Sequence, residues 1–75
     1  MTITMNALVK RINRNLAQDD EMLRKARGER TRFDLGEFYL VDMHRNFIVG
    51  DHLDPETLGR ALGVMREWEH VETTD

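Results

Sequence analysis

The residues of this sequence that could bind a metal ion lie near its middle. Asp51, His52 and Asp54 are close together, and His44 lies near Asp42. Imidazole and carboxylate groups are metal ligands, but a site needs three or four of them converging at fixed distances. Histidine beside aspartate is also common on surface loops, and Asp54 is a natural cap for a following helix. We therefore expect no metal site and no other cofactor.

Catalysis has few candidate residues. The chain contains neither cysteine nor serine, which are the commonest nucleophiles. Its acidic side chains are scattered, and nothing suggests the burial that would separate the pKa values of a general acid and a general base. Gly59 and Gly63 lie in or at the end of a predicted helix, so they do not form a phosphate-binding loop after a strand. We predict that the protein is not an enzyme.

Length and composition predict one small domain over residues 1–75, with a polar C-terminal tail at about 70–75. The chain has 75 residues, of which 40% are hydrophobic and 33% charged, a globular composition. Without cysteine no disulfide can stabilise so small a core, which leaves helix packing or oligomerisation. The sequence shows no signal-peptide core and no apolar run of about 18 residues. We expect a cytoplasmic protein that does not enter membranes.

The net charge of −3 is unevenly distributed, because residues 1–32 carry +4 and residues 33–75 carry −7. Such an asymmetry is found in proteins with anionic partners, and equally in proteins whose two surfaces attract each other. Basic side chains on the first helix could contact the phosphates of a nucleic acid. Nucleic-acid binding is therefore the alternative function, through Lys10, Arg11, Arg14, Arg24, Lys25 and Arg27.

The first element that must position these side chains is a helix. Thr2 or Thr4 could cap its start, and apolar residues recur at helical spacing from there on. Beyond Leu16, apolar residues at this helical spacing become sparse. The helix either continues to about Arg27, before Gly28, or breaks near Asp19 and restarts. The stripe comprises Met5, Leu8, Val9, Ile12 and Leu16.

A charged connector over residues 29–34 is expected to precede a β-hairpin with strands at 36–42 and 47–51. Both segments are rich in β-branched and aromatic residues, and Asn46 suits a positive φ in the turn. If Asp42 pairs with Phe47, one face carries Phe38, Leu40, Phe47 and Val49. The other face then carries Tyr39, Val41 and Ile48, so both faces are apolar.

The second helix has the clearest ends. Asp54 is its predicted N-cap, Pro55 occupies the first helical position, and Gly63 ends it with Val64 folded back. A short turn or helix over residues 65–69 is expected to bring Trp68 onto the core. The apolar stripe of this helix comprises Leu58, Ala61, Leu62 and Met65.

The whole chain resembles small bacterial proteins of unknown function, especially in residues 11–16, in residues 38–42 with Arg45 and Asn46, and in residues 54–64. This resemblance implies a bacterial or phage origin and supplies no activity.

These elements predict an α+β fold of α-β-β-α order, with two helices packed on a two-stranded antiparallel hairpin. If the helices cover one face of the hairpin, Tyr39, Val41 and Ile48 stay exposed beside open strand edges. A second copy could cover them and extend the sheet; alternatively, each helix covers one face. We predict a small non-enzymatic interaction or regulatory module that forms a homodimer or binds another protein through these three residues.

Overall fold

The computed structural model describes residues 2–72. The class is α+β, as predicted, but the order of elements is not α-β-β-α. The described residues form, in chain order, β1 (Thr2–Ile3), α1 (Met5–Leu16), the 3-10 helix η1 (Ala17–Asp19), β2 (Glu21–Lys25), α2 (Glu29–Leu35), β3 (Phe38–Asp42), β4 (Phe47–Gly50), α3 (Pro55–Ala61) and β5 (His70–Val71).

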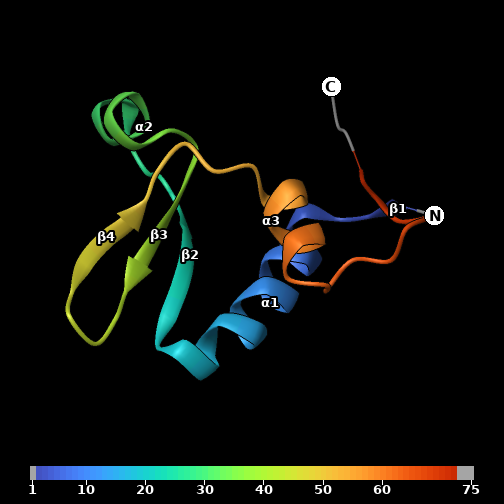
Figure 1. Cartoon of the computed structure of the whole chain (residues 1–75). Helices are drawn as coiled ribbons and strands as arrows, with labels where there is room; N and C mark the ends of the chain where they lie inside the picture. Colours follow the sequence, from blue (N-terminus) through green and yellow to red (C-terminus); the bar gives the residue numbers. More distant parts are fainter. Residues whose placement is uncertain (1, 73–75) are drawn as a thin grey trace.

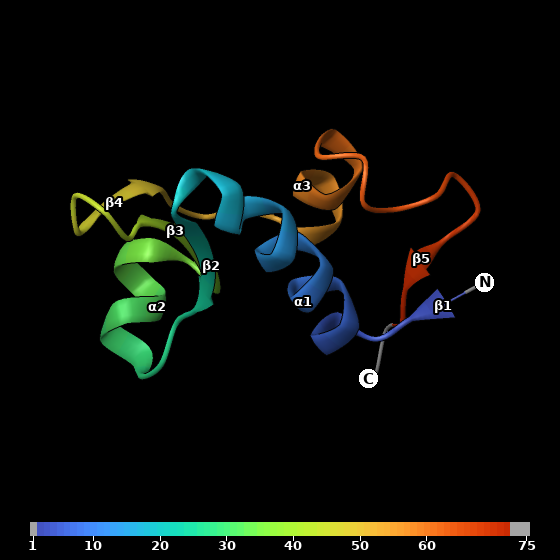
Figure 2. The same ribbon diagram turned by 90° about the horizontal axis from the view of Figure 1, so that it is seen from below.

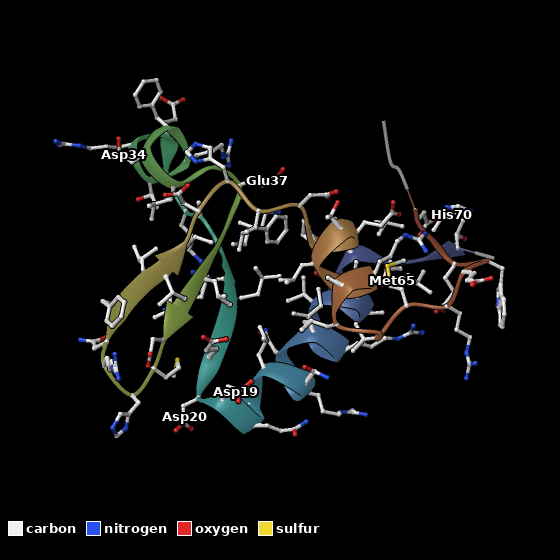
Figure 3. All side chains as sticks on the ribbon, in the orientation of Figure 1. Asp19, Asp20, Asp34, Glu37, Met65 and His70 are labelled. Carbon is white, nitrogen blue, oxygen red and sulfur yellow. The ribbon has the colours of Figure 1, made fainter. Side chains whose placement is uncertain are left out.

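Helix α1 follows the predicted apolar stripe. The side chain of Thr4 caps it by accepting a hydrogen bond from the Ala7 N–H at 3.1 Å. Three residues of the stripe are buried, Leu8, Ile12 and Leu16. The chain then leaves the helix through η1 and Asp20, whose φ of 55° is left-handed. Of the two alternatives for this segment, the break near Asp19 is therefore confirmed (Figure 3).

The segment after the break is a strand and not a restarted helix, so the prediction of a two-stranded hairpin was wrong. Strand β2 pairs antiparallel with β3, with Leu23 opposite Leu40, and the sheet has the order β2-β3-β4. Residues such as Glu, Met, Leu, Arg and Lys favour helices when isolated. Here the burial of Leu23 against the core outweighs that preference. Whether a segment forms a strand depends mainly on how its side chains pack.

The hairpin of β3 and β4 has the predicted turn, with Asp42 opposite Phe47 and Asn46 at a φ of 60°. Beyond the pair of Val41 and Ile48, however, the next pairing joins Leu40 to Gly50. Val49 is therefore an extra residue in β4, a β-bulge. The predicted alternation, which placed Val49 on the face of Leu40, does not continue through this bulge.

The segment expected to be a charged connector forms α2, a helix without a buried residue. It ends at Gly36, whose φ is 78° and whose position leaves no room for a side chain. A Cβ at Gly36 would lie 2.7 Å from the His52 Cα. The His52 N–H donates to the Leu35 carbonyl at 2.7 Å, so the end of α2 is fixed to the chain that follows β4.

Helix α3 begins and ends as predicted. Asp54 is its N-cap residue and Pro55 follows. Gly63 has a φ of 74°, and the Val64 N–H donates to the Gly59 carbonyl at 3.0 Å, which closes the helix. Trp68, predicted to reach the core, is instead 57% exposed, and Met65 occupies the core in this segment (Figure 3).

The molecule is flat, measuring 35 × 31 × 15 Å, and its hydrophobic core is built around α1. Helix α1 contacts both β2 and α3, whereas β4 lies at the far side of the sheet (Figure 1). Near the termini, β1 and β5 pair in parallel (Figure 2). The expected packing of both helices onto the hairpin is therefore replaced by a core around α1, comprising Leu8, Ile12, Leu16, Leu23, Phe38 and Met65.

Candidate functional site

An apolar surface extends over β4 and the turn before it, and we call it the β4 surface. Its side chains are exposed by 50% for Met43, 46% for Phe47, 44% for Ile48 and 42% for Val49. Strand β4 is at the edge of its sheet and pairs with β3 alone among the described strands. The surface therefore combines exposed apolar side chains with an open strand edge, a combination that favours pairing with another chain.

The three predicted interaction residues differ in exposure. Ile48 belongs to the β4 surface, while its cross-strand partner Val41 and the nearby Tyr39 are each only partly exposed. Two other members of the surface, Phe47 and Val49, were assigned by sequence to the opposite face. Their exposure was missed because the hairpin was expected to lie against two helices, whereas α1 contacts the far strand, β2.

At the opposite edge of the sheet, Asn13 of α1 closes the backbone of Leu23. The Leu23 N–H donates to the Asn13 Oδ1 at 2.7 Å, and the Asn13 Nδ2 donates to the Leu23 carbonyl at 3.3 Å. The carboxamide thus makes the two hydrogen bonds that a neighbouring strand would make. Among the described residues, the β2 edge is therefore closed at Leu23, whereas no side chain makes such bonds at the β4 edge.

The six predicted phosphate-contacting residues are divided between two elements. Lys10 and Arg14 are exposed on α1, whereas three others lie on β2 or in the loop after it. Those three, Arg24, Lys25 and Arg27, line a groove of about 790 Å³ that also includes residues of α1, α2 and β3. Their prediction as members of one basic helix assumed a continuation of α1 that does not occur.

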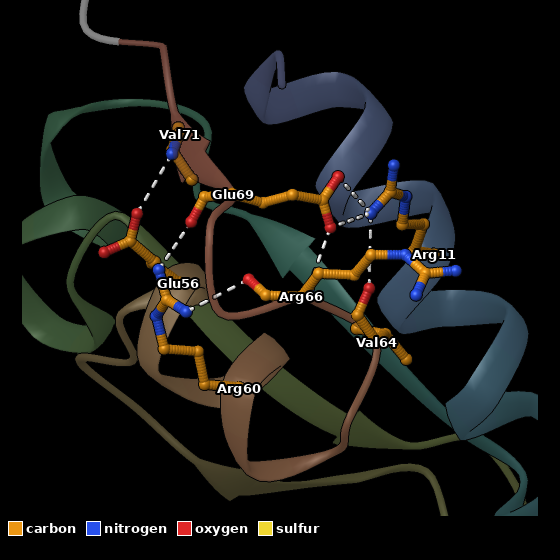
Figure 4. Close-up of polar contacts among 7 residues, drawn as sticks. All are labelled: Arg11, Glu56, Arg60, Val64, Arg66, Glu69 and Val71. Atoms are coloured by element: carbon orange, nitrogen blue, oxygen red, sulfur yellow. Dashed lines mark hydrogen bonds and ion pairs between the residues drawn. The ribbon is translucent and has the colours of Figure 1, made fainter. Parts of the chain in front are cut away.

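The sixth basic residue, Arg11, forms an ion pair with Glu69 (Figure 4). Its Nη1 donates to both carboxylate oxygens, at 2.9 and 3.0 Å, and to the Val64 carbonyl at 3.3 Å. The guanidinium is thereby directed at the C-terminal segment. Sequence reasoning missed this pair, because the two residues are 58 positions apart and Glu69 resembles any surface glutamate.

Glu69 is only 4% exposed and accepts further bonds. The Arg66 N–H donates to its Oε1 at 2.9 Å. The hydrogen bonds from Arg11 and from the Arg66 backbone hold the pKa of Glu69 below its usual value of 4.5, although burial acts in the opposite direction. The Arg60 Nη2 donates to the Glu69 backbone carbonyl at 2.6 Å, so the charged network fastens the C-terminal segment to α1 and α3 (Figure 4).

Of the residues considered as metal ligands, Asp42, Asp51, His52 and Asp54 each form hydrogen bonds through their side chains. The His52 Nδ1 lies 3.0 Å from the Asp51 Oδ1, and the Thr57 hydroxyl donates to the Asp54 Oδ2 at 2.8 Å. Asp42 accepts the backbone N–H groups of residues 44 and 45 in the hairpin turn. Among residues 2–72, no three His, Asp or Glu side chains are grouped so that they could hold a metal ion.

Comparison of the chain with protein-family models, with curated proteins and with solved structures found no significant match. Within the described part of the chain, no helix has the length and apolar character needed to cross a membrane. Functional inference therefore rests on the β4 surface, the groove and the network around Glu69.

Proposed function

We propose that this protein is a small, non-enzymatic interaction module that forms a homodimer through the β4 surface. The observation that carries the proposal is the row of three consecutive exposed apolar residues, Phe47 to Val49, on the uncovered edge of the sheet. Because neighbouring side chains of a strand point to opposite faces of the sheet, these residues leave apolar side chains exposed on both faces at this edge, and exposed apolar patches mark interaction sites. Pairing of two β4 edges would join two three-stranded sheets into one of six strands.

The contrast between the two edges supports this assignment. At β2 the chain uses Asn13 to satisfy the backbone of Leu23, which blocks strand pairing at that position. At β4 no comparable side chain closes the edge, and the exposed residues are apolar rather than charged. An edge strand of this composition is an aggregation hazard unless a partner covers it. A second copy of the chain offers the same apolar row and can cover it reciprocally.

Sedimentation velocity over a hundredfold range of concentration tests the proposal with the variant Ile48→Asp. We expect the wild-type protein to dimerise as its concentration rises. The variant should remain a monomer throughout, because each dimer would bury a carboxylate without a partner. The matched control is Asn6→Asp, which adds the same charge at an exposed position of α1 and should dimerise like the wild type.

Far-UV circular dichroism of each variant shows whether the fold is retained. If Ile48→Asp unfolds, Phe47→Arg provides the second test at a neighbouring exposed position. A wild-type protein that stays monomeric over the whole range contradicts the proposal. So does a folded variant of β4 that dimerises as strongly as the wild type.

A further inference from the structure

The groove beside β2 is cationic, and we define it by its basic residues, Arg24, Lys25 and Arg27. All three are exposed, and none forms an ion pair with another described residue. No carboxylate of the described chain lines this groove, although the protein as a whole has a net charge of −3. The positive charge is therefore concentrated at one place, where it favours an anionic ligand.

An aromatic side chain lies among these charges. Tyr39 of β3 is the cross-strand partner of Arg24 and lines the same groove, together with Thr31 of α2 and the apolar Val9 and Met22. The pairing of β2 with β3 brings Tyr39 into a basic segment that has no aromatic residue of its own. A cationic groove with an aromatic side chain is the arrangement by which proteins hold single strands of nucleic acid.

The backbone of β2 adds a donor at the same place. Both backbone groups of Leu23 point away from β3 toward Asn13, whereas the Ala26 N–H donates to the Glu37 carbonyl at 2.8 Å. Because backbone groups alternate along an antiparallel strand, those of Lys25 are directed outward, like those of Leu23. The edge of β2 thus adds an outward N–H group to the basic side chains of the groove, and both kinds of donor suit phosphate oxygens.

We propose that the cationic groove binds single-stranded nucleic acid, with Arg24, Lys25 and Arg27 contacting phosphates and Tyr39 stacking on a base. The partly exposed ring of Tyr39 and the apolar lining favour this ligand over a simple anion, which would use the charges alone. The groove lies on the β2 side of the sheet, where α1 and α2 flank β2 (Figure 2). It is separate from the β4 surface, so this inference does not depend on dimer formation.

Fluorescence anisotropy with a labelled oligothymidylate of about 12 nucleotides tests the proposal. For three phosphate contacts, the affinity should fall about twentyfold between about 50 and 200 mM salt. In Arg24→Gln/Arg27→Gln, with one contact left, the affinity should be lower and the same change in salt should reduce it only about threefold. The matched control, Lys10→Gln/Arg14→Gln, removes two exposed charges from α1 and should leave the salt dependence unchanged.

The role of the aromatic ring is tested with Tyr39→Leu, which should weaken oligothymidylate binding about fivefold or more. Tyr39→Phe keeps the ring and should bind like the wild type. An abasic phosphodiester of the same length should bind more weakly than oligothymidylate and should not respond to Tyr39→Leu. Circular dichroism confirms that each variant is folded.

Three results would overturn the proposal. The first is no binding of oligothymidylate at about 50 mM salt. The second is an equal loss of affinity in the groove variant and the α1 control, which would indicate attraction by overall charge. The third is equally tight binding of the abasic polymer or of oligoglutamate, which would assign the groove to polyanions in general or to an acidic protein.

Discussion

Among residues 2–72, Glu69 is the one charged side chain that is buried, and it links three parts of the chain. Its carboxylate receives Arg11 of α1 and the Arg66 N–H, while its backbone carbonyl receives Arg60 of α3. A buried carboxylate is costly unless hydrogen bonds compensate it. Here they do, and these bonds add to the packing of Val64, Met65 and Val71 against the core in holding the C-terminal segment in place.

The lowered pKa of Glu69 predicts a specific dependence of stability on pH. A carboxyl group with a lower pKa in the folded than in the unfolded state stabilises the fold above its unfolded pKa. That stabilisation is lost as the pH falls from about 4.5 through the lower folded value. We expect Glu69→Gln to be less stable than the wild type at neutral pH and to converge with it in acid.

Urea unfolding from pH 7 to pH 3 measures this difference. The exposed neighbour Glu67 offers a matched control, since Glu67→Gln removes the same charge without touching Arg11. Its stability should follow that of the wild type at every pH. Parallel curves for Glu69→Gln and the wild type would mean that the ion pair contributes no net stability.

At the scale of elements, α1 packs on β2 through the core and also closes the backbone of Leu23 with one carboxamide, that of Asn13. Asn13→Ala removes both hydrogen bonds to the Leu23 backbone and leaves its N–H and C=O groups partly buried without these partners. We expect a loss of about 1–3 kcal/mol in the free energy of unfolding, although alanine favours the helix more than asparagine does. Asn15→Ala, on the same helix, should change the stability by no more than about 0.5 kcal/mol. Chemical denaturation that gives equal values for the two variants would contradict the role of Asn13.

Local signals made part of these elements predictable from the sequence. The start of α1, the turn at Asn46 and both ends of α3 depend on residues within a few positions of one another, and these predictions are confirmed. Strand β2 was missed because its residues favour a helix, and its strand state comes from pairing with β3. Helix α2 was missed because it buries no residue and so has no apolar stripe.

The same reasoning explains which parts of the candidate sites could be predicted. The apolar character of both hairpin faces left two alternatives open, exposure of Ile48 or covering of both faces by the two helices, and the structure shows Ile48 exposed. The cationic groove could not be derived, because Arg24 meets Tyr39 only through the pairing of β2 with β3. The ion pair of Arg11 with Glu69 depends on where the C-terminal segment lies, and no local pattern determines that.

At the scale of the whole molecule, stability should decrease from the core toward β4. The buried residues gather around α1, while β4 contributes none to the core and is attached laterally only to β3. Amide groups of weakly packed elements exchange with solvent through local opening, at rates set by local rather than global stability. In dilute solution, we therefore expect the amides of β4 to exchange faster than those of α1.

A homodimer through the β4 surface would slow the amide exchange of β4, by an amount that depends on the protein concentration. Dimer formation stabilises the folded β4 that it requires, and this stabilisation grows as the protein concentration rises. Hydrogen–deuterium exchange measured at two concentrations about a hundredfold apart should therefore show protection of residues 47–50 that grows with concentration. In Ile48→Asp the protection should stay at the dilute value, with α1 unchanged in both proteins. If sedimentation shows a dimer but exchange in β4 does not respond to concentration, the two copies must meet elsewhere, and the apolar row of β4 must serve a different partner.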